Sequence, residues 1–260
     1  MTIQTRKVTK SKIHQCLYLA LMCFLMQLSG CAKASNSLER SLIEAVAPQQ
    51  KVKDILKFEI NSVENVRVID GDNPHIGLYL AKNNSKLNNG VRAELSLDYP
   101  FEEGETVTYH WKMKIPADFK SDAPRNRWWS MAQWHDQPNR IKKETWKNHA
   151  SLSPPVALYY GVFRGKDVLS VHYKGLKPSP YDLIELKRDQ WTTIDMQIKW
   201  SQKGDGWLKV FVNGSADPVV VKKGPNMHND YQHYLKLGMY RDPSIETENW
   251  VFIDELMINP

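Results

Sequence analysis

The stretch Glu105–Ile115 reads Glu-Thr-Val-Thr-Tyr-His-Trp-Lys-Met-Lys-Ile and alternates polar residues with β-branched and aromatic ones. A period of two is typical of a strand that buries one face. Similar runs follow at residues 156–163, 168–173, 191–200, 207–212 and 250–258. Turn signals such as Asn213-Gly214 separate them. About a dozen short strands at hairpin spacing predict an all-β fold, an antiparallel β-sandwich or jelly roll.

The first thirty residues have the features of an export signal. Four basic residues precede an apolar run at residues 16–26, which is too short to span a bilayer comfortably. The segment Leu28-Ser29-Gly30-Cys31 resembles the lipobox of bacterial lipoproteins, in which the cysteine is lipidated after cleavage. We therefore expect residues 1–30 to be a lipoprotein signal peptide and Cys31 to anchor an exported protein to the cell envelope, at the outer membrane or in the periplasm. An ordinary secretory signal is the alternative.

Charge and cysteine usage constrain the mature part of the chain. All three cysteines lie at or before position 31, so the domain has neither a disulfide nor a thiolate catalyst. Removal of the signal would leave 31 of the 35 basic residues against 29 acidic ones, a net charge near +2, which does not favour nucleic acid as a partner. We expect residues 31–51 to be a flexible tether and residues 52–260 to form a single monomeric domain.

Three segments carry chemically capable residues at alternate positions, with apolar residues between them. These residues are Arg92, Glu94 and Ser96; Gln133 and His135; and Lys236 and Tyr240, which flank Gly238. If the three strands are neighbours in one sheet, their polar side chains converge on one groove, where Gly238 would leave room for a sugar ring. Each segment alone is explained as well by the solvated face of a half-buried strand. The recurrence of this set favours a functional site.

The same segments resemble the motifs of a known enzyme family. Arg92-Ala93-Glu94-Leu95, Gln133-Trp134-His135 and the run Tyr234–Tyr240 are similar to the Arg-x-Glu-Leu, Gln-x-His and Tyr-x-Lys-x-Gly-x-Tyr motifs of jelly-roll polysaccharide lyases. This family includes alginate lyases, glucuronan lyases and heparin lyase I. The resemblance covers most of residues 52–260. It implies a concanavalin-like jelly roll that cleaves a uronate-containing polysaccharide (glucuronan, alginate or heparin-like) by β-elimination and gives unsaturated oligosaccharides.

The resemblance also implies roles for individual residues. Arg92 and Gln133 would hold the uronate carboxylate, His135 would assist or act as the base, and Tyr240 would act as acid or base. Further contacts with the acidic polysaccharide are expected from Lys236, Glu94, Arg241 and Trp134.

The chemistry of β-elimination explains why such residues are needed. The reaction removes the proton at C5 of a uronate and expels the oxygen at C4, so donors to the carboxylate favour the transition state. Cations near Tyr240, such as Lys236, Arg241 or Arg92, would favour its phenolate. In glucuronate and mannuronate the proton and the leaving oxygen lie on the same side of the ring, so Tyr240 alone could serve both. In guluronate and iduronate they lie on opposite sides, and His135 would be the better base.

The mechanism requires no cofactor. Glu59 and Asp254 resemble positions that hold a structural calcium ion in many jelly rolls, although paired ends of exposed strands explain them equally well. Residues 136–154 match no known pattern and could be a lid over the groove or a solvated loop.

Two other functions fit the same architecture. A non-catalytic cell-surface glycan-binding module is the main alternative, although binding alone would not require Tyr240 beside Gln133 and His135. A glycoside hydrolase would need a pair of carboxylates, and Glu94 is the only carboxylate within the three motifs.

Overall fold

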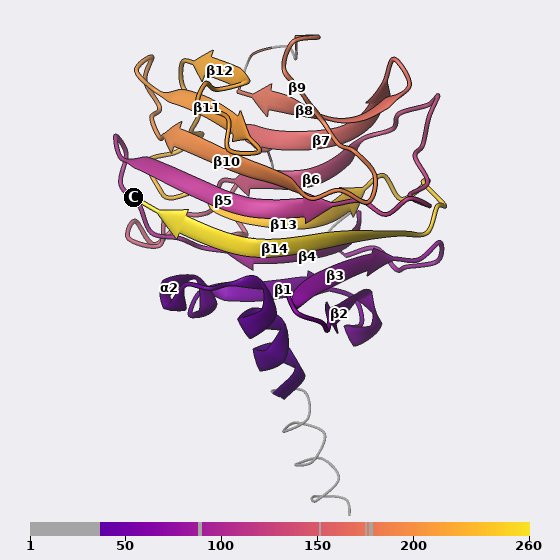
Figure 1. The fold of residues 1–260 in the computed structure, drawn as a ribbon. Coiled ribbons are helices and arrows are strands. Elements are labelled where there is room, and N and C mark those ends of the chain that lie inside the picture. Colours follow the sequence, from indigo (N-terminus) through magenta and orange to yellow (C-terminus); the bar gives the residue numbers. More distant parts are fainter. Residues whose placement is uncertain (1–36, 88–89, 151, 175, 177–178) are drawn as a thin grey trace, which may run out of the picture. The chain divides into compact units, whose positions relative to one another are not determined.

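A computed structural model describes residues 37–87, 90–150, 152–174, 176 and 179–260. The predicted signal peptide and Cys31 lie outside the described residues. Two antiparallel sheets of seven strands, called sheet A and sheet B here, lie face to face in the part from residue 42 onward (Figure 1). The predicted all-β sandwich of the jelly-roll type is thereby confirmed. Within the described ranges, no helix is long and apolar enough to cross a membrane.

The strand order of each sheet defines the surroundings of the three motifs. Sheet A runs β1 (Leu56–Ile60), β4 (Val91–Leu97), β13 (Tyr234–Arg241), β6 (Trp129–His135), β7 (Val156–Phe163), β8 (Lys166–Tyr173) and β9 (Leu183–Glu185). Sheet B runs β12 (Val220–Lys223), β11 (Trp207–Val212), β10 (Thr192–Lys199), β5 (Thr106–Lys114), β14 (Asn249–Asn259), β3 (His75–Leu80) and β2 (Val66–Ile69). The short helices are α2 (Gln50–Lys53) and the 3-10 helix η1 (Val63–Asn65). The motif strands β4, β13 and β6 are therefore neighbours in sheet A.

The core lies between the two sheets, and β5 shows how the sequence alternation builds it. Val107, Tyr109, Trp111 and Met113 are each at most 1% exposed, whereas the residues between them are only partly buried. The Tyr109 ring meets Trp134 of sheet A edge to face at 5.1 Å between centroids. Full burial of a large apolar side chain contributes roughly 1.5–3 kcal/mol, so this alternation fixes which face of each strand points inward.

The segment expected to be a tether differs in the structure. Residues 42–46 are helical, and the side chains of Leu42, Val46, Ala47 and Val52 belong to the buried core. Leu42 and Val46 are four positions apart and so share one face of the helix. Residues 42–51 are therefore part of the domain, contrary to the prediction of a flexible tether.

Gly238 has a different role from the one expected. Its φ of +144° is a conformation that residues with a side chain rarely adopt. A Cβ atom there would lie 2.4 Å from the carbonyl oxygen of Ala93 and 2.7 Å from Cδ1 of Leu78 in the core. Glycine is thus required by the close approach of the backbone and the core, and not by space for a sugar ring.

Candidate active site

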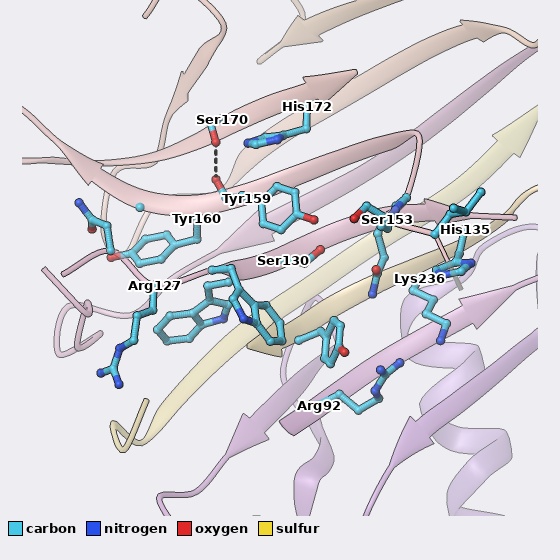
Figure 2. A pocket seen from close by; sticks show the side chains of 18 of the residues that line it. Arg92, Arg127, Ser130, His135, Ser153, Tyr159, Tyr160, Ser170, His172 and Lys236 are labelled. Atoms are coloured by element: carbon cyan, nitrogen blue, oxygen red, sulfur yellow. Dashed lines mark hydrogen bonds between the residues drawn. The ribbon is translucent and has the colours of Figure 1, made fainter. Parts of the chain in front are cut away.

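A groove of about 1410 Å³ lies on the outer face of sheet A and is lined by side chains from β4, β13, β6, β7 and β8. Figure 2 shows these side chains turned into one space, with Arg92, Lys236 and His135 on one side and Tyr159, Ser170 and His172 on the other. Five of the residues predicted to bind or transform the substrate line the groove, namely Arg92, Gln133, His135, Lys236 and Tyr240, and Glu59, predicted as a calcium ligand, lines it as well. The structure therefore brings together all four expected catalytic residues.

The strand register orders these side chains in rows across the sheet. One row is Arg92, Tyr240, Ser130, Tyr159 and Ser170. A second row is Ser96, Lys236, Gln133, Ala157 and His172. The alternation of β6 is interrupted by a register shift between Ser130 and Ala132. Because of this bulge, Ser130 and Gln133 both line the groove although they are an odd number of residues apart.

A buried network of charges supports the groove. Nη1 of Arg92 donates to Oε2 of Glu59 at 3.0 Å and to Oε2 of Glu94 at 3.1 Å. Nζ of Lys236 donates to the same oxygen of Glu59 at 2.8 Å, and Nε2 of Gln133 donates to Oε1 of Glu94 at 2.8 Å. Since one of the two N–H groups of Gln133 is used in this way, its amide is held in a fixed orientation and has a second donor for a ligand.

Glu94 occupies the centre of this network and does not line the groove. Its side chain is 0% exposed. Burial raises the pKa of Glu94, while the charges of Arg92 and Lys236 and the bond from Gln133 oppose the rise. The expected contact between Glu94 and the substrate is therefore wrong, because a side chain without exposed surface cannot reach a sugar. Its role is to hold Arg92 and Gln133.

Tyr240 is held from three sides. The Arg92 guanidinium lies over the ring of Tyr240 at 3.9 Å from its centroid, and Trp128 meets the ring edge to face at 4.8 Å. On another side the backbone of Gly90 is so close that a Cβ atom would lie 2.0 Å from Cε2 of the tyrosine. The position of the phenol is thus set by packing as well as by its strand.

Gly90→Ala should consequently impair the site without unfolding the protein. The tyrosine ring must move to admit the new methyl group, and a displacement of about 1 Å can cost up to about 10²-fold in rate. We expect kcat to fall by about tenfold or more, while the midpoint of thermal unfolding changes little. Gly204→Ala is the matched control, since nothing lies within 4 Å of a Cβ atom at Gly204. Equal kcat values for the two variants would show that the contact with Gly90 does not position Tyr240.

Two other expected substrate contacts are wrong for a similar reason. Trp134 is 0% exposed and points into the core, where aromatic rings of β5 surround it. Arg241 is also 0% exposed, and its guanidinium donates to the carbonyl oxygen of Ala81 at 3.3 Å and to the hydroxyl of Thr247 at 3.2 Å. Burial lowers the pKa of Arg241 to about 10. Both side chains belong to the inner face of sheet A.

The structure gives no support to calcium at the two expected positions. Glu59 lies in β1 of sheet A and already accepts from two cations, whereas Asp254 lies in β14 of sheet B, where burial raises its pKa. In the described part of the chain, no group of three or more His, Cys, Asp or Glu side chains could hold a metal ion.

His135 is the last residue of β6 and directly precedes the loop at residues 136–154. Its Nδ1 lies 2.8 Å from the carbonyl oxygen of Asp136 and 3.1 Å from Oδ1 of the same residue. A carbonyl oxygen can only accept, so Nδ1 carries the proton and Nε2 is the basic atom of the neutral ring. The ring centroid of His135 lies 5.9 Å from that of Tyr234, its partner on β13.

The loop at residues 136–154 contributes to the groove. Trp146, His149, Ser153 and Pro154 line it, although the exposed surface of Trp146 is 57%. A lid over the groove was one of the two interpretations of this loop, but the individual side chains were not predicted, because an irregular loop has no periodicity that assigns its side chains to a face. Ser130, Tyr159 and His172 were missed as well: the bulge conceals Ser130, and the last two lie in strands without a recognised motif.

Comparison with known proteins gives three results. The profile of a family described as polysaccharide lyase matches residues 46–257. No curated protein sequence matches the chain. Among solved structures, the endo-β-1,4-glucuronan lyase from the fungus Trichoderma reesei has a TM-score of 0.55 and 12% sequence identity, with 78% of this chain and 90% of that one covered.

Two further solved structures show the range of the fold. A polysaccharide lyase family-7 alginate lyase has a TM-score of 0.54 and 14% identity, with 79% of this chain and 94% of that one covered. The catalytic domain of a glycoside hydrolase family 131 protein from Coprinopsis cinerea has a TM-score of 0.54 and 12% identity, with 79% and 83% covered. At such low identity these likenesses show the fold alone, and the fold carries more than one chemistry.

Proposed function

This chain belongs to the polysaccharide lyase family, and from that premise we propose that it cleaves a uronate-containing polysaccharide by β-elimination. The observation that carries the proposal is that Gln133, His135 and Tyr240 line one groove, above a buried network that holds Gln133 and the Arg92 guanidinium packed over Tyr240. Similar structures include a glucuronan lyase and alginate lyases. One of the alginate lyases was solved as a His-to-Asn and Tyr-to-Phe double variant in complex with substrate.

The groove offers donors for the uronate carboxylate. The second N–H of Gln133 and the ammonium group of Lys236 lie in adjacent positions of one cross-strand row. Both side chains are held from below, by Glu94 and Glu59 respectively, so they need not reorganise when negative charge builds on the carboxylate. We assign them to carboxylate binding. Arg92 packs over Tyr240. It also donates to Glu59, which Lys236 contacts as well, and to Glu94, which Gln133 contacts as well.

Tyr240 or His135 transfers the proton in this proposal. The base takes the proton from C5, the C4–C5 double bond forms, and the C4–O bond breaks as the leaving oxygen receives a proton. For a glucuronate- or mannuronate-type unit, Tyr240 can take the first proton and return it. For a guluronate- or iduronate-type unit, Nε2 of His135 takes the proton and Tyr240 donates one.

The proposal is tested by incubating the purified protein with glucuronan, alginate, heparin and hyaluronan. β-Elimination gives an unsaturated product that absorbs in the ultraviolet, and we expect this absorbance to rise with at least one polymer. New reducing ends without the absorbance would indicate hydrolysis. This outcome is included because a glycoside hydrolase is among the proteins of similar fold. Binding without either product would indicate a glycan-binding module.

We also propose that the enzyme is exported and anchored by lipid at Cys31, on the strength of the Leu28–Cys31 sequence. The mature protein should begin at Cys31, carry acyl groups and partition with membranes. Mass spectrometry of the N-terminal peptide from native cells measures this, with Cys31→Ser as the comparison. An unmodified N-terminus at any other residue contradicts the proposal.

A further inference from the structure

The residue that follows the Gln-x-His motif contacts two histidines. Asp136 is 1% exposed. Its Oδ1 lies 3.1 Å from Nδ1 of His135, and its Oδ2 lies 2.8 Å from Nε2 of His149. Burial opposes the ionised form of Asp136, but the nearby N–H and charge of His135, with the charges of His233 and His149, leave the pKa of Asp136 below its usual value. A buried carboxylate therefore stands between the groove histidine and a histidine of the 136–154 loop.

A second set of contacts joins the same loop to the same histidine. The Trp146 ring meets His149 edge to face at 5.5 Å and Tyr234 at 6.4 Å. Tyr234 in turn packs against His135 at 5.9 Å. The loop thus contacts His135 through Asp136 on one side and through Tyr234 on the other.

We propose that Asp136 is a positioning residue for His135. His149, which lies in the loop, holds the carboxylate of Asp136 in place through its second oxygen. The inference rests on the proposed function, since it gives His135 a part in the proton transfer. The carbonyl oxygen of Asp136 keeps the proton on Nδ1, and the carboxylate beside Nδ1 stabilises the positive charge that the ring gains when Nε2 acts as the base. Without the bond from His149, the carboxylate could rotate away from Nδ1, and the carbonyl oxygen of Asp136 would be left to orient the imidazole without it.

The other charges near His135 come from several elements. Tyr234 and His233 are the neighbours of His135, and the charges of Glu59 of β1, Arg92 and Glu94 of β4 and Lys236 of β13 lie around Tyr234, while His228 lies beside His233. Burial lowers the pKa of His233 to about 4, so this side chain stays neutral near neutral pH. Glu59 and Glu94 are paired with Arg92 and Lys236. Asp136 is thus the carboxylate in direct contact with the imidazole of His135.

The first test is Asp136→Asn. We expect kcat to fall by about 10-fold to 10²-fold, as for the loss of a partner that orients a reacting group, with little change in KM. A negative charge favours the protonated imidazole, so its removal favours the neutral ring. The acidic limb of the kcat/KM profile should therefore move to lower pH. Asp195→Asn is the matched control: it breaks a similar pair with His110 (2.6 Å) in sheet B and should change neither quantity.

The second test separates orientation from mere packing of the loop. His149→Ala removes the donor to Asp136, and His149→Gln keeps an N–H at the end of the side chain. We expect kcat to fall in the alanine variant and to be largely restored in the glutamine variant. If both variants and Asp136→Asn keep the wild-type kcat and pH profile, the proposal is overturned.

A third measurement does not depend on activity. In protein labelled with ¹⁵N-histidine, the neutral form of His135 should carry its proton on Nδ1, where the carbonyl oxygen of Asp136 accepts it, and Asp136→Asn or His149→Ala should shift the His135 signals because the ring loses its fixed orientation. The signal is assigned by its loss in His135→Gln. Unchanged His135 signals in both variants overturn the coupling. If the wild-type protein forms no unsaturated product from any polymer, the proposed function fails while these spectra still decide the coupling.

Discussion

Tyr240→Phe is expected to leave a folded protein that binds its polysaccharide and has lost at least about 10²-fold in kcat, because general acid–base groups contribute roughly 10²–10⁴-fold. The change removes one oxygen and keeps the ring on which Arg92 and Trp128 pack. Stability should therefore change little. The measurement is the initial rate of unsaturated product formation, together with the midpoint of thermal unfolding.

Two other tyrosines serve as comparisons for this variant. Tyr159 lies in the same cross-strand row, but burial raises the pKa of its hydroxyl, so Tyr159→Phe should cost much less activity. Tyr79 stacks on Trp250 in sheet B, and Tyr79→Phe should have no effect. A Tyr240→Phe protein with more than about a tenth of the wild-type rate would refute the assigned role.

Glu94→Ala should have the largest effect on stability. The carboxylate is fully buried and accepts bonds from Arg92 and Gln133. Removing one partner of a buried ion pair typically costs about 3–5 kcal/mol, and the amide of Gln133 loses its acceptor as well. We expect the free energy of unfolding to fall by about 3 kcal/mol or more. At temperatures well below the midpoint of thermal unfolding, kcat should also fall, because Gln133 is no longer oriented.

Glu255→Ala is the control for this prediction. Its carboxylate pairs with Lys112 at 2.5 Å in sheet B, and the Glu255 side chain is 44% exposed. Exposed pairs contribute about 0–1 kcal/mol, so little change is expected. If Glu94→Ala costs no more than Glu255→Ala in chemical denaturation, the network beneath the groove does not depend on Glu94.

Alternation along the strands predicted which face each motif residue occupies. It correctly placed Arg92, Lys236 and Tyr240 together, because β4 and β13 are regular over most of their shared length. It did not predict that Glu94, on the same face as Arg92, is covered by its neighbours. A period of two assigns a side chain to a face, but its burial depends on side chains that cross from adjacent strands, here those of Glu59 and Lys236.

Other features of the site lie beyond local patterns. The bulge in β6 shifts the phase of the alternation between Ser130 and Gln133, and no residue in that stretch signals it. The cation of Arg241 directly follows Tyr240 in the chain, yet in a strand the next residue points to the opposite face. The contact between Asp136 and His149 joins two irregular positions, for which the sequence gives no spacing rule.

The insertion of β13 between β4 and β6 has a consequence for how the enzyme forms. This central strand comes from residues 234–241, whereas its two partners end at residues 97 and 135. Pairings between segments so distant in the chain form slowly, on the order of milliseconds to seconds in all-β domains. Until β13 docks, β4 and β6 expose unpaired edges and the groove lacks both Lys236 and Tyr240. The groove is therefore completed at a late step of folding, once residues 234–241 are available to pair with β4 and β6.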